Sequence, residues 1–137
     1  MIVVVDTNVL FASLRSKYSK LREQFFNPSF SYYTPNFLVV EIFKHKERIL
    51  KKAKASEDEV YEFLNKVIQR IHFVNEDTIS HINALEAYSL CKDIDETDTP
   101  FVALTLEMDG RLWTKDMVLK KGLSKKGFHK FFDEDDF

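Results

Sequence analysis

Apolar and polar residues follow one another along the chain in two patterns, one typical of strands and one typical of helices. Short apolar or aromatic runs at residues 2–5, 30–34, 72–74 and 111–114 predict strands. Between these runs, apolar residues recur at helical spacing. Strands that alternate with helices favour right-handed crossovers. We therefore predict an α/β fold, a three-layer α/β/α sandwich with a central parallel sheet.

The clearest helical pattern begins after Ser56. Ser56 and Glu59 have the spacing of a capping box, in which each side chain satisfies a free backbone N–H of the first turn. Six apolar residues that follow recur at helical spacing, and we expect all of them in the core. They are Val60, Phe63, Leu64, Val67, Ile68 and Ile71.

Other helices are predicted from their capping residues. Asn8 is expected to cap a helix that runs to about Ser16, and Asn36 is expected to cap a helix that runs towards Lys52. Pro100 suits the first position of a further helix, because its missing N–H would be unpaired there anyway. That helix is expected at residues 101–108, and the remaining helices are expected at residues 19–26 and from 77 or 78 to about 90.

Composition limits the domain organisation. The chain has 137 residues, 45% of them hydrophobic, and only three Gly and three Pro, which favours one compact domain over residues 1–137. The acidic segment 133–137 is expected to be a frayed tail. The lone Cys91 cannot form an internal disulfide, and with four scattered His it forms no recognisable zinc motif.

Charge and hydropathy limit the partners. A net charge of −2 gives no overall attraction to nucleic acid, so local basic patches would have to hold any such partner. The apolar run at residues 2–5 is too short for a signal sequence or a membrane span. We therefore expect a cytoplasmic protein without membrane contact.

Four carboxylates stand where predicted elements begin or end. Asp6 follows the first strand, Glu41 lies within an apolar helical stretch, Asp98 precedes the helix begun by Pro100, and Asp116 follows the last strand. Open parallel sheets bind ligands beyond the carboxyl ends of their strands, where Asp6 and Asp116 would meet. A simpler interpretation exists for each acid. The three Asp residues could be turn or cap residues, and Glu41 could face solvent.

A cluster of these four acids would need a cation. Two carboxylates about 4 Å apart repel by roughly 1 to 4 kcal/mol in a wet or partly buried site. Hard oxygen ligands suit Mg²⁺ or Mn²⁺ better than zinc or copper. Such an ion lowers the pKa of a bound water and stabilises charge on a phosphoryl group. The acids together therefore predict phosphodiester hydrolysis without a protein nucleophile.

The segments that carry these acids resemble the successive blocks of PIN-domain ribonucleases. These blocks are residues 6–10, 34–42, 95–104 and 112–116. The resemblance implies a Mg²⁺- or Mn²⁺-dependent endoribonuclease, and for the VapC-type toxins of the family an antitoxin partner. By position, the family's metal-binding acids fall on Asp6, Glu41, Asp98 and Asp116, with Asn8 and Thr114 as polar support and Asp95 as an extra acid. Residues 41–45 and 95–98 look closer to PIN proteins outside the best-known toxin branch.

Lysines crowd the helix after Glu41 and the segment after Asp116. Both groups could hold RNA phosphates or could be solvated faces. The candidates for RNA contact are Lys44, Lys46, Lys115, Lys120 and Lys121. Thirteen Phe on a small protein leave apolar surface for a partner, and PIN domains of this size commonly pair, so we expect a homodimer.

Two other functions compete with a ribonuclease. The first strand and its Asp6 also resemble the first motif of haloacid-dehalogenase-type phosphatases, but Asn8 stands where their acid/base aspartate is needed and cannot transfer a proton. A catalytically inactive PIN-like module that binds RNA or a protein is the second alternative. The complete set of four acids argues against it, so we predict a metal-dependent endoribonuclease, with the toxin of a toxin-antitoxin pair as one biological role.

Overall fold

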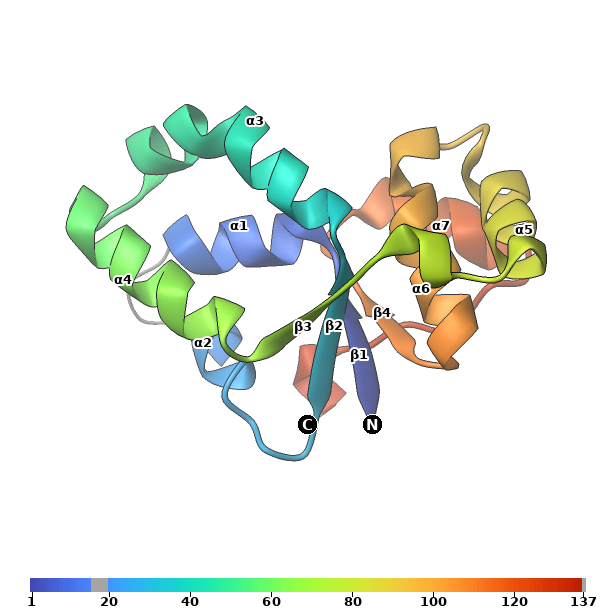
Figure 1. Ribbon diagram of the computed structural model, residues 1–137, viewed down its shortest axis with the longest axis horizontal. Coiled ribbons are helices and arrows are strands. Elements are labelled where there is room, and N and C mark those ends of the chain that lie inside the picture. The colour runs from blue at the N-terminus through green and yellow to red at the C-terminus, as the bar shows by residue number, and fades with distance from the viewer. Residues whose placement is uncertain (16–19, 137) are drawn as a thin grey trace.

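A four-stranded parallel sheet forms the centre of the computed structural model, which describes residues 1–15 and 20–136 (Figure 1). Its strands are β1 (Ile2–Val5), β2 (Ser31–Pro35), β3 (Ile71–Val74) and β4 (Arg111–Trp113), in the order β3-β2-β1-β4. β1 pairs with β2 on one side and with β4 on the other. Val3, Val4 and Val5 are fully buried, as expected for an inner strand covered on both faces.

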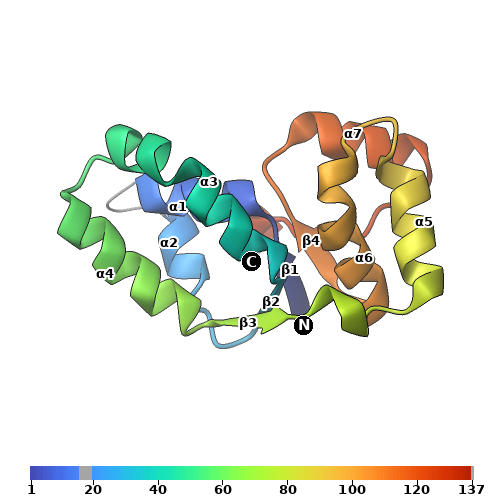
Figure 2. The same cartoon turned by 45° about the horizontal axis from the view of Figure 1, so that its top comes forward.

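Helices cover both faces of the sheet (Figures 1 and 2). One layer holds α1 (Thr7–Arg15), α2 (Lys20–Gln24), α3 (Phe37–Lys52) and α4 (Glu57–Ile68), and the other holds α5 (His81–Cys91), α6 (Thr99–Met108) and α7 (Met117–Lys125). This arrangement confirms the predicted three-layer α/β/α sandwich. No helix in the described part of the chain is both long and apolar enough to cross a membrane.

The strands pass into helices at one common edge of the sheet. β1 is followed by Asp6 alone before α1 begins, and β2 is followed by Asn36 alone before α3 begins. β4 leads through residues 114–116 into α7. Because parallel strands end at the same edge, these short connections bring the first turns of α1, α3 and α7 to one place.

One predicted helix cap, Asn8, is wrong, and the other, Asn36, is correct in position but makes no side-chain cap bond. α1 begins at Thr7, so Asn8 lies inside its first turn, where its side chain contacts other residues of the sheet edge. Asn36 precedes α3 but makes no side-chain cap bond. The N–H of Phe37 instead donates to Glu76 Oε1 at 2.9 Å, so a distant side chain replaces the local cap.

The helix expected from Asp77 begins later than predicted. Residues 76–78 form a short 3-10 turn capped by Asn75. α5 starts at His81, because the Ser80 side chain accepts the N–H of Asn83. Several potential caps follow one another here, and the local sequence alone does not choose between them.

The helix after Ser56 agrees with its prediction except at its end. The Ser56 hydroxyl accepts the Glu59 N–H at 3.3 Å, which confirms the cap. Val60, Val67 and Ile71 are buried, and Phe63 and Leu64 are partly buried. Ile68 is 38% exposed, so its assignment to the core is wrong. It lines an open apolar groove between α4 and α3.

The C-terminal segment is held against the sheet. The Leu112 N–H donates to Lys130 O at 2.8 Å and the Phe132 N–H donates to Leu112 O at 2.9 Å, which covers the outer edge of β4. Glu134 accepts the Trp113 Nε1–H at 2.5 Å. The expectation of a frayed tail is therefore wrong for residues 133–136. Ser16, Ser19 and Phe137, where other predicted ends fall, lie outside the described residues.

Candidate active site

Asp6 is held in one orientation at the end of β1. Its side chain is buried, with 4% of the residue exposed. Oδ1 accepts the N–H of Thr7 at 2.8 Å, and Oδ2 accepts the Thr114 hydroxyl at 2.7 Å and the Asn8 amide at 3.2 Å. These three donors fix the carboxylate and partly compensate its burial.

Thr114 and Asn8 join the end of β4 to the end of β1. The Thr114 hydroxyl, which donates to Asp6, accepts the Asp116 N–H at 3.1 Å. The Lys115 N–H donates to Asn8 Oδ1 at 2.9 Å. Asp116 also caps α7, because its Oδ1 accepts the Leu119 N–H at 3.1 Å. Both interpretations of Asp116, helix cap and site acid, are therefore compatible with its position.

An open pocket of about 400 Å³ lies at this edge of the sheet. It is lined by Asp6, Thr7, Asn8, Phe11, Phe37, Glu41, Lys44, His45, Arg48, Asp95, Thr97 and Asp98. Three of the four predicted site acids thus share one pocket, although they come from β1, α3 and the start of α6. Asp116 does not line this pocket, but its negative charge contributes to the raised pKa values of Asp6 and Asp98.

The acids lie within one another's electrostatic field. Burial, followed by the charges of Asp6, Asp95, Asp116 and Glu41, raises the pKa of Asp98 to about 7. Burial also raises the pKa of Asp6 to about 6, although its bonds from Thr114 and Thr7 act in the opposite direction. Perturbed carboxyl groups of this kind concentrate at functional sites.

The donor atoms of the pocket fit a hard divalent cation. Carboxylate oxygens predominate, and Asp98 Oδ2 is buried without a hydrogen-bond partner among the described residues. A buried oxygen of this kind requires a proton, a water or a cation. As the side chains are placed, no three His, Cys, Asp or Glu groups among residues 1–15 and 20–136 are close enough together to hold an ion. The chemistry of the donors fits Mg²⁺ or Mn²⁺, and the holding of such an ion by Asp6, Glu41, Asp98 and Asp116 stays a prediction.

Several residues of the pocket were not assigned to the site from the sequence, although Arg48 belongs to the basic group that follows Glu41. His45 Nε2 lies 3.3 Å from Glu41 Oε2, one helical turn further along α3. Arg48 lies on the same face of α3 one turn after His45, and Thr97 comes from the turn before α6. The i, i+4 spacing from Glu41 was the available signal for His45. Asp95, the extra acid, also lines the pocket and accepts the Thr97 hydroxyl at 2.7 Å.

Only one of the five candidate RNA-contact lysines lines this pocket. Lys44 does so, whereas Lys46 points to the opposite face of α3. Its Nζ lies 5.7 Å from the centre of the Tyr61 ring, in the apolar groove with α4. The side chain of Lys46 is therefore separated from the acids by the body of its own helix.

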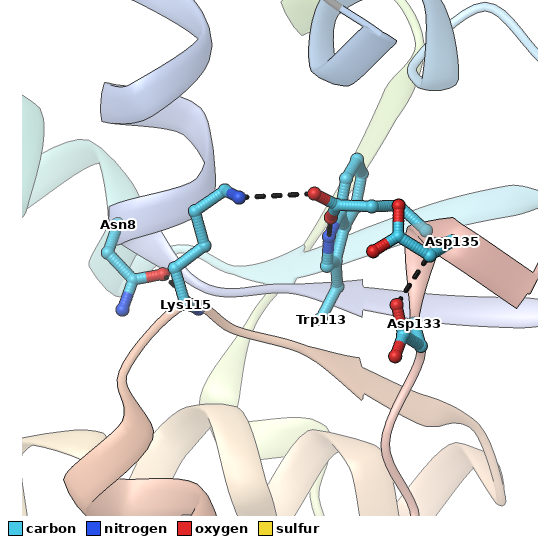
Figure 3. A network of polar contacts seen from close by, with 6 residues as sticks. Asn8, Trp113, Lys115, Asp133 and Asp135 are labelled. Carbon is cyan, nitrogen blue, oxygen red and sulfur yellow. Dashed lines mark hydrogen bonds and ion pairs between the residues drawn. The ribbon is translucent and has the colours of Figure 1, made fainter.

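The lysines after Asp116 have other neighbours. Lys115 extends from the end of β4 over the C-terminal segment (Figure 3), where its Nζ lies 3.1 Å from Glu134 Oε1. Lys120 Nζ lies 5.7 Å from the centre of the Phe131 ring, and Lys121 is exposed on α7. RNA contact by these lysines stays a prediction.

Fold and site define a class of protein in which an acidic pocket lies at the carboxyl edge of a parallel sheet, between two helical layers. A family model described as PIN domain matches residues 4–131. The chain therefore belongs to the PIN-domain family, whose members are generally nucleases and typically use divalent metals. The match does not separate VapC-type toxins from other branches of the family. No curated protein sequence matches the chain.

Proposed function

We propose that the protein is a Mg²⁺- or Mn²⁺-dependent endoribonuclease that hydrolyses RNA phosphodiester bonds. The observation that supports this most is the pocket that Asp6, Glu41 and Asp98 share, together with the unpartnered buried oxygen of Asp98 within the described part of the chain. Membership of the PIN family supports a nucleic-acid substrate. The choice of RNA over DNA rests on the resemblance to PIN-domain ribonucleases.

In the proposed mechanism, Asp6, Glu41, Asp98 and Asp116 would hold the metal, which would supply a water of lowered pKa and stabilise charge on the phosphoryl oxygens. Thr114 and Asn8 keep Asp6 oriented through the hydrogen bonds described above. Lys44 gives the rim of the pocket a positive charge that would attract the phosphate.

No side chain of the pocket needs to act as a nucleophile. The chain's lone cysteine, Cys91, is buried outside the pocket lining, and burial raises the pKa of its thiol to about 11. A thiol with so high a pKa is a poor nucleophile at neutral pH. We infer attack by a water held at the acids, because a metal ion bound there would lower the pKa of that water.

A cleavage assay separates the ribonuclease from an inactive RNA-binding module. Labelled single-stranded RNA is incubated with the protein in Mn²⁺, in Mg²⁺ and in chelator. We expect cutting at internal positions with either metal and none in chelator. Binding without cutting under all three conditions would support the module instead and would contradict the proposed activity.

Two finer parts of the proposal concern partners. We infer a homodimer, supported by the large apolar side chains that the structure leaves exposed, such as Phe43 and Ile82. The toxin role and its antitoxin partner rest on the resemblance to VapC-type proteins alone. A small reading frame directly upstream, whose product binds this protein and inhibits it, is the expected sign of a toxin. Its absence would contradict that role.

A further inference from the structure

A second, basic pocket adjoins the acidic one along the groove between α1 and α3. It measures about 170 Å³ and is lined by Phe11, Arg15, Arg48, Ile49 and Lys52. Phe11 and Arg48 also line the acidic pocket, so the two cavities are neighbours along this groove. Three of the five lining residues are cationic, whereas the acidic pocket next to it holds four carboxylates.

The periodicity of the two helices produces this change of charge. On α1, Asn8, Phe11 and Arg15 follow one another at spacings of three and four residues and so lie on one face. The corresponding face of α3 carries Glu41, His45, Arg48 and Lys52. The rings of Phe11 and His45 are in contact, with centroids 5.8 Å apart, and fix the two faces against each other. Near the sheet edge, the face of α3 carries the acid Glu41 and the face of α1 carries the amide of Asn8. One to three turns further along the helices, both faces carry basic residues.

The cations of the basic pocket have no counterion in the described part of the chain. None of Arg15, Arg48 and Lys52 forms an ion pair with residues 1–15 or 20–136. Arg15 and Lys52 lie in the last turns of their helices, where a cation stabilises the helix dipole. That explanation does not apply to Arg48, which lies before the last turn of α3. Like charges gathered around one small pocket repel one another unless an anion is bound.

We propose that this pocket is a phosphate-binding subsite for the nucleic-acid backbone, which rests on the proposed nuclease function. Arg48 lies seven residues after Glu41, a separation of about 10 Å along the helix axis. A phosphate in the pocket is therefore not the one being cut, which has to reach the acids, but a neighbouring phosphate of the same strand. One guanidinium group can donate two parallel N–H hydrogen bonds to two oxygens of the same phosphate. The pocket is smaller than typical small-molecule sites and suits a single phosphate group.

Binding of labelled oligonucleotides tests the subsite without any need for catalysis. Single-stranded RNA of mixed sequence, and DNA of the same sequence, are titrated with protein in chelator over a series of salt concentrations, and binding is followed by fluorescence anisotropy. The variants are Arg48→Gln, the double variant Arg15→Gln with Arg48→Gln, and Lys51→Gln. Lys51 is a matched control, because it lies in the last turn of α3 but does not line the pocket.

We expect the double variant to bind RNA and DNA about tenfold more weakly than the wild type. The slope of log affinity against log salt concentration should become shallower by about 0.7 for each phosphate that the protein no longer neutralises. Arg48→Gln is expected to show part of this effect, and Lys51→Gln less than about a twofold change. Melting temperatures measured alongside check that each variant is folded, and Arg48→Lys, which keeps the charge, should restore part of the affinity.

Two results would overturn the subsite: equal affinity of the wild type and the double variant, or no binding of either oligonucleotide by the wild type. Failure of the proposed nuclease gives a different result. A protein that binds in chelator with the expected dependence on Arg15 and Arg48, but never cuts RNA when metal is added, keeps the subsite and loses the activity.

Discussion

At the residue scale, the two buried acids Asp6 and Asp98 give the metal-free protein a dependence on pH. Their pKa values are raised in the folded state to about 6 and about 7, from the value of 3.8 that an unperturbed Asp has. Between about pH 4 and pH 7 the folded protein therefore binds more protons than the unfolded chain, and its stability falls as pH rises.

We predict that the free energy of unfolding in chelator falls by on the order of 3 kcal/mol between about pH 4 and pH 7.5, after allowance for solvent screening at Asp98. Urea unfolding followed by the fluorescence of Trp113, the chain's single tryptophan, measures it. Asp98→Asn should flatten the curve and stabilise the protein at pH 7.5, because it removes both the buried charge and its repulsion of Asp6. Glu86→Gln, an exposed acid on α5, is the matched control. If the free energy of unfolding fell equally steeply with pH in Asp98→Asn and in the wild type, the predicted contribution of Asp98 to the pH dependence would be contradicted.

At the scale of the element, the two faces of α3 separate two lysines that the sequence alone treats alike. Lys44 lines the acidic pocket and Lys46 lies over Tyr61 on the other side of the helix. We predict that Lys44→Gln weakens RNA binding several-fold and that Lys46→Gln leaves it within about twofold of wild type, since only the first cation is near the proposed RNA path. Anisotropy titrations at one low salt concentration compare them. A larger effect of Lys46→Gln would place the RNA over α4 instead.

The C-terminal segment provides a second prediction at this scale. Glu134 accepts the indole N–H of Trp113 and forms an ion pair with Lys115, so Glu134→Gln removes the charge that strengthens both interactions. We expect it to lower the free energy of unfolding by about 1 to 2 kcal/mol. Asp136→Asn, on the same short turn, serves as the control and should change it by less than about 0.5 kcal/mol. Equal stabilities for both variants would mean that the segment does not help to hold β4.

The sequence predicted elements well where one signal stood alone and poorly where several competed. Ser56 followed by a regular apolar period predicted the start of α4, although Ile71, the last residue of that period, lies in β3. Asp6, Thr7 and Asn8 are all acceptable caps, and a bond to Thr114, more than a hundred residues away, decides how Asn8 is used. Asp6 and Asp116 could be proposed as site acids because they follow strand ends, whereas Glu41 and Asp98 were proposed from the resemblance to PIN-domain blocks. Arg15 could not, because its role depends on how α1 and α3 pack against each other.

At the scale of the whole molecule, exposed apolar side chains on both helical layers favour self-association. Phe43 on α3 is 76% exposed, and Ile82 on α5 and Val118 on α7 are 77% and 73% exposed. We predict a homodimer, because burial of such side chains between two copies removes apolar surface from water. Size-exclusion chromatography with light scattering, over micromolar and higher concentrations, measures the mass. A monomer throughout would contradict the prediction.

The single-turnover rate of RNA cleavage in Mn²⁺ tests the acidic site most directly. It is measured for the wild type, for Asp6→Asn, Glu41→Gln, Asp98→Asn and Asp116→Asn, and for the control Glu86→Gln, with circular dichroism to confirm the fold of each. We predict that each of the four site variants loses at least about a hundredfold in rate, about 2.7 kcal/mol of transition-state stabilisation, while the control stays within about twofold. Rates near wild type in two of the four would contradict the assignment of these acids to one metal-dependent site.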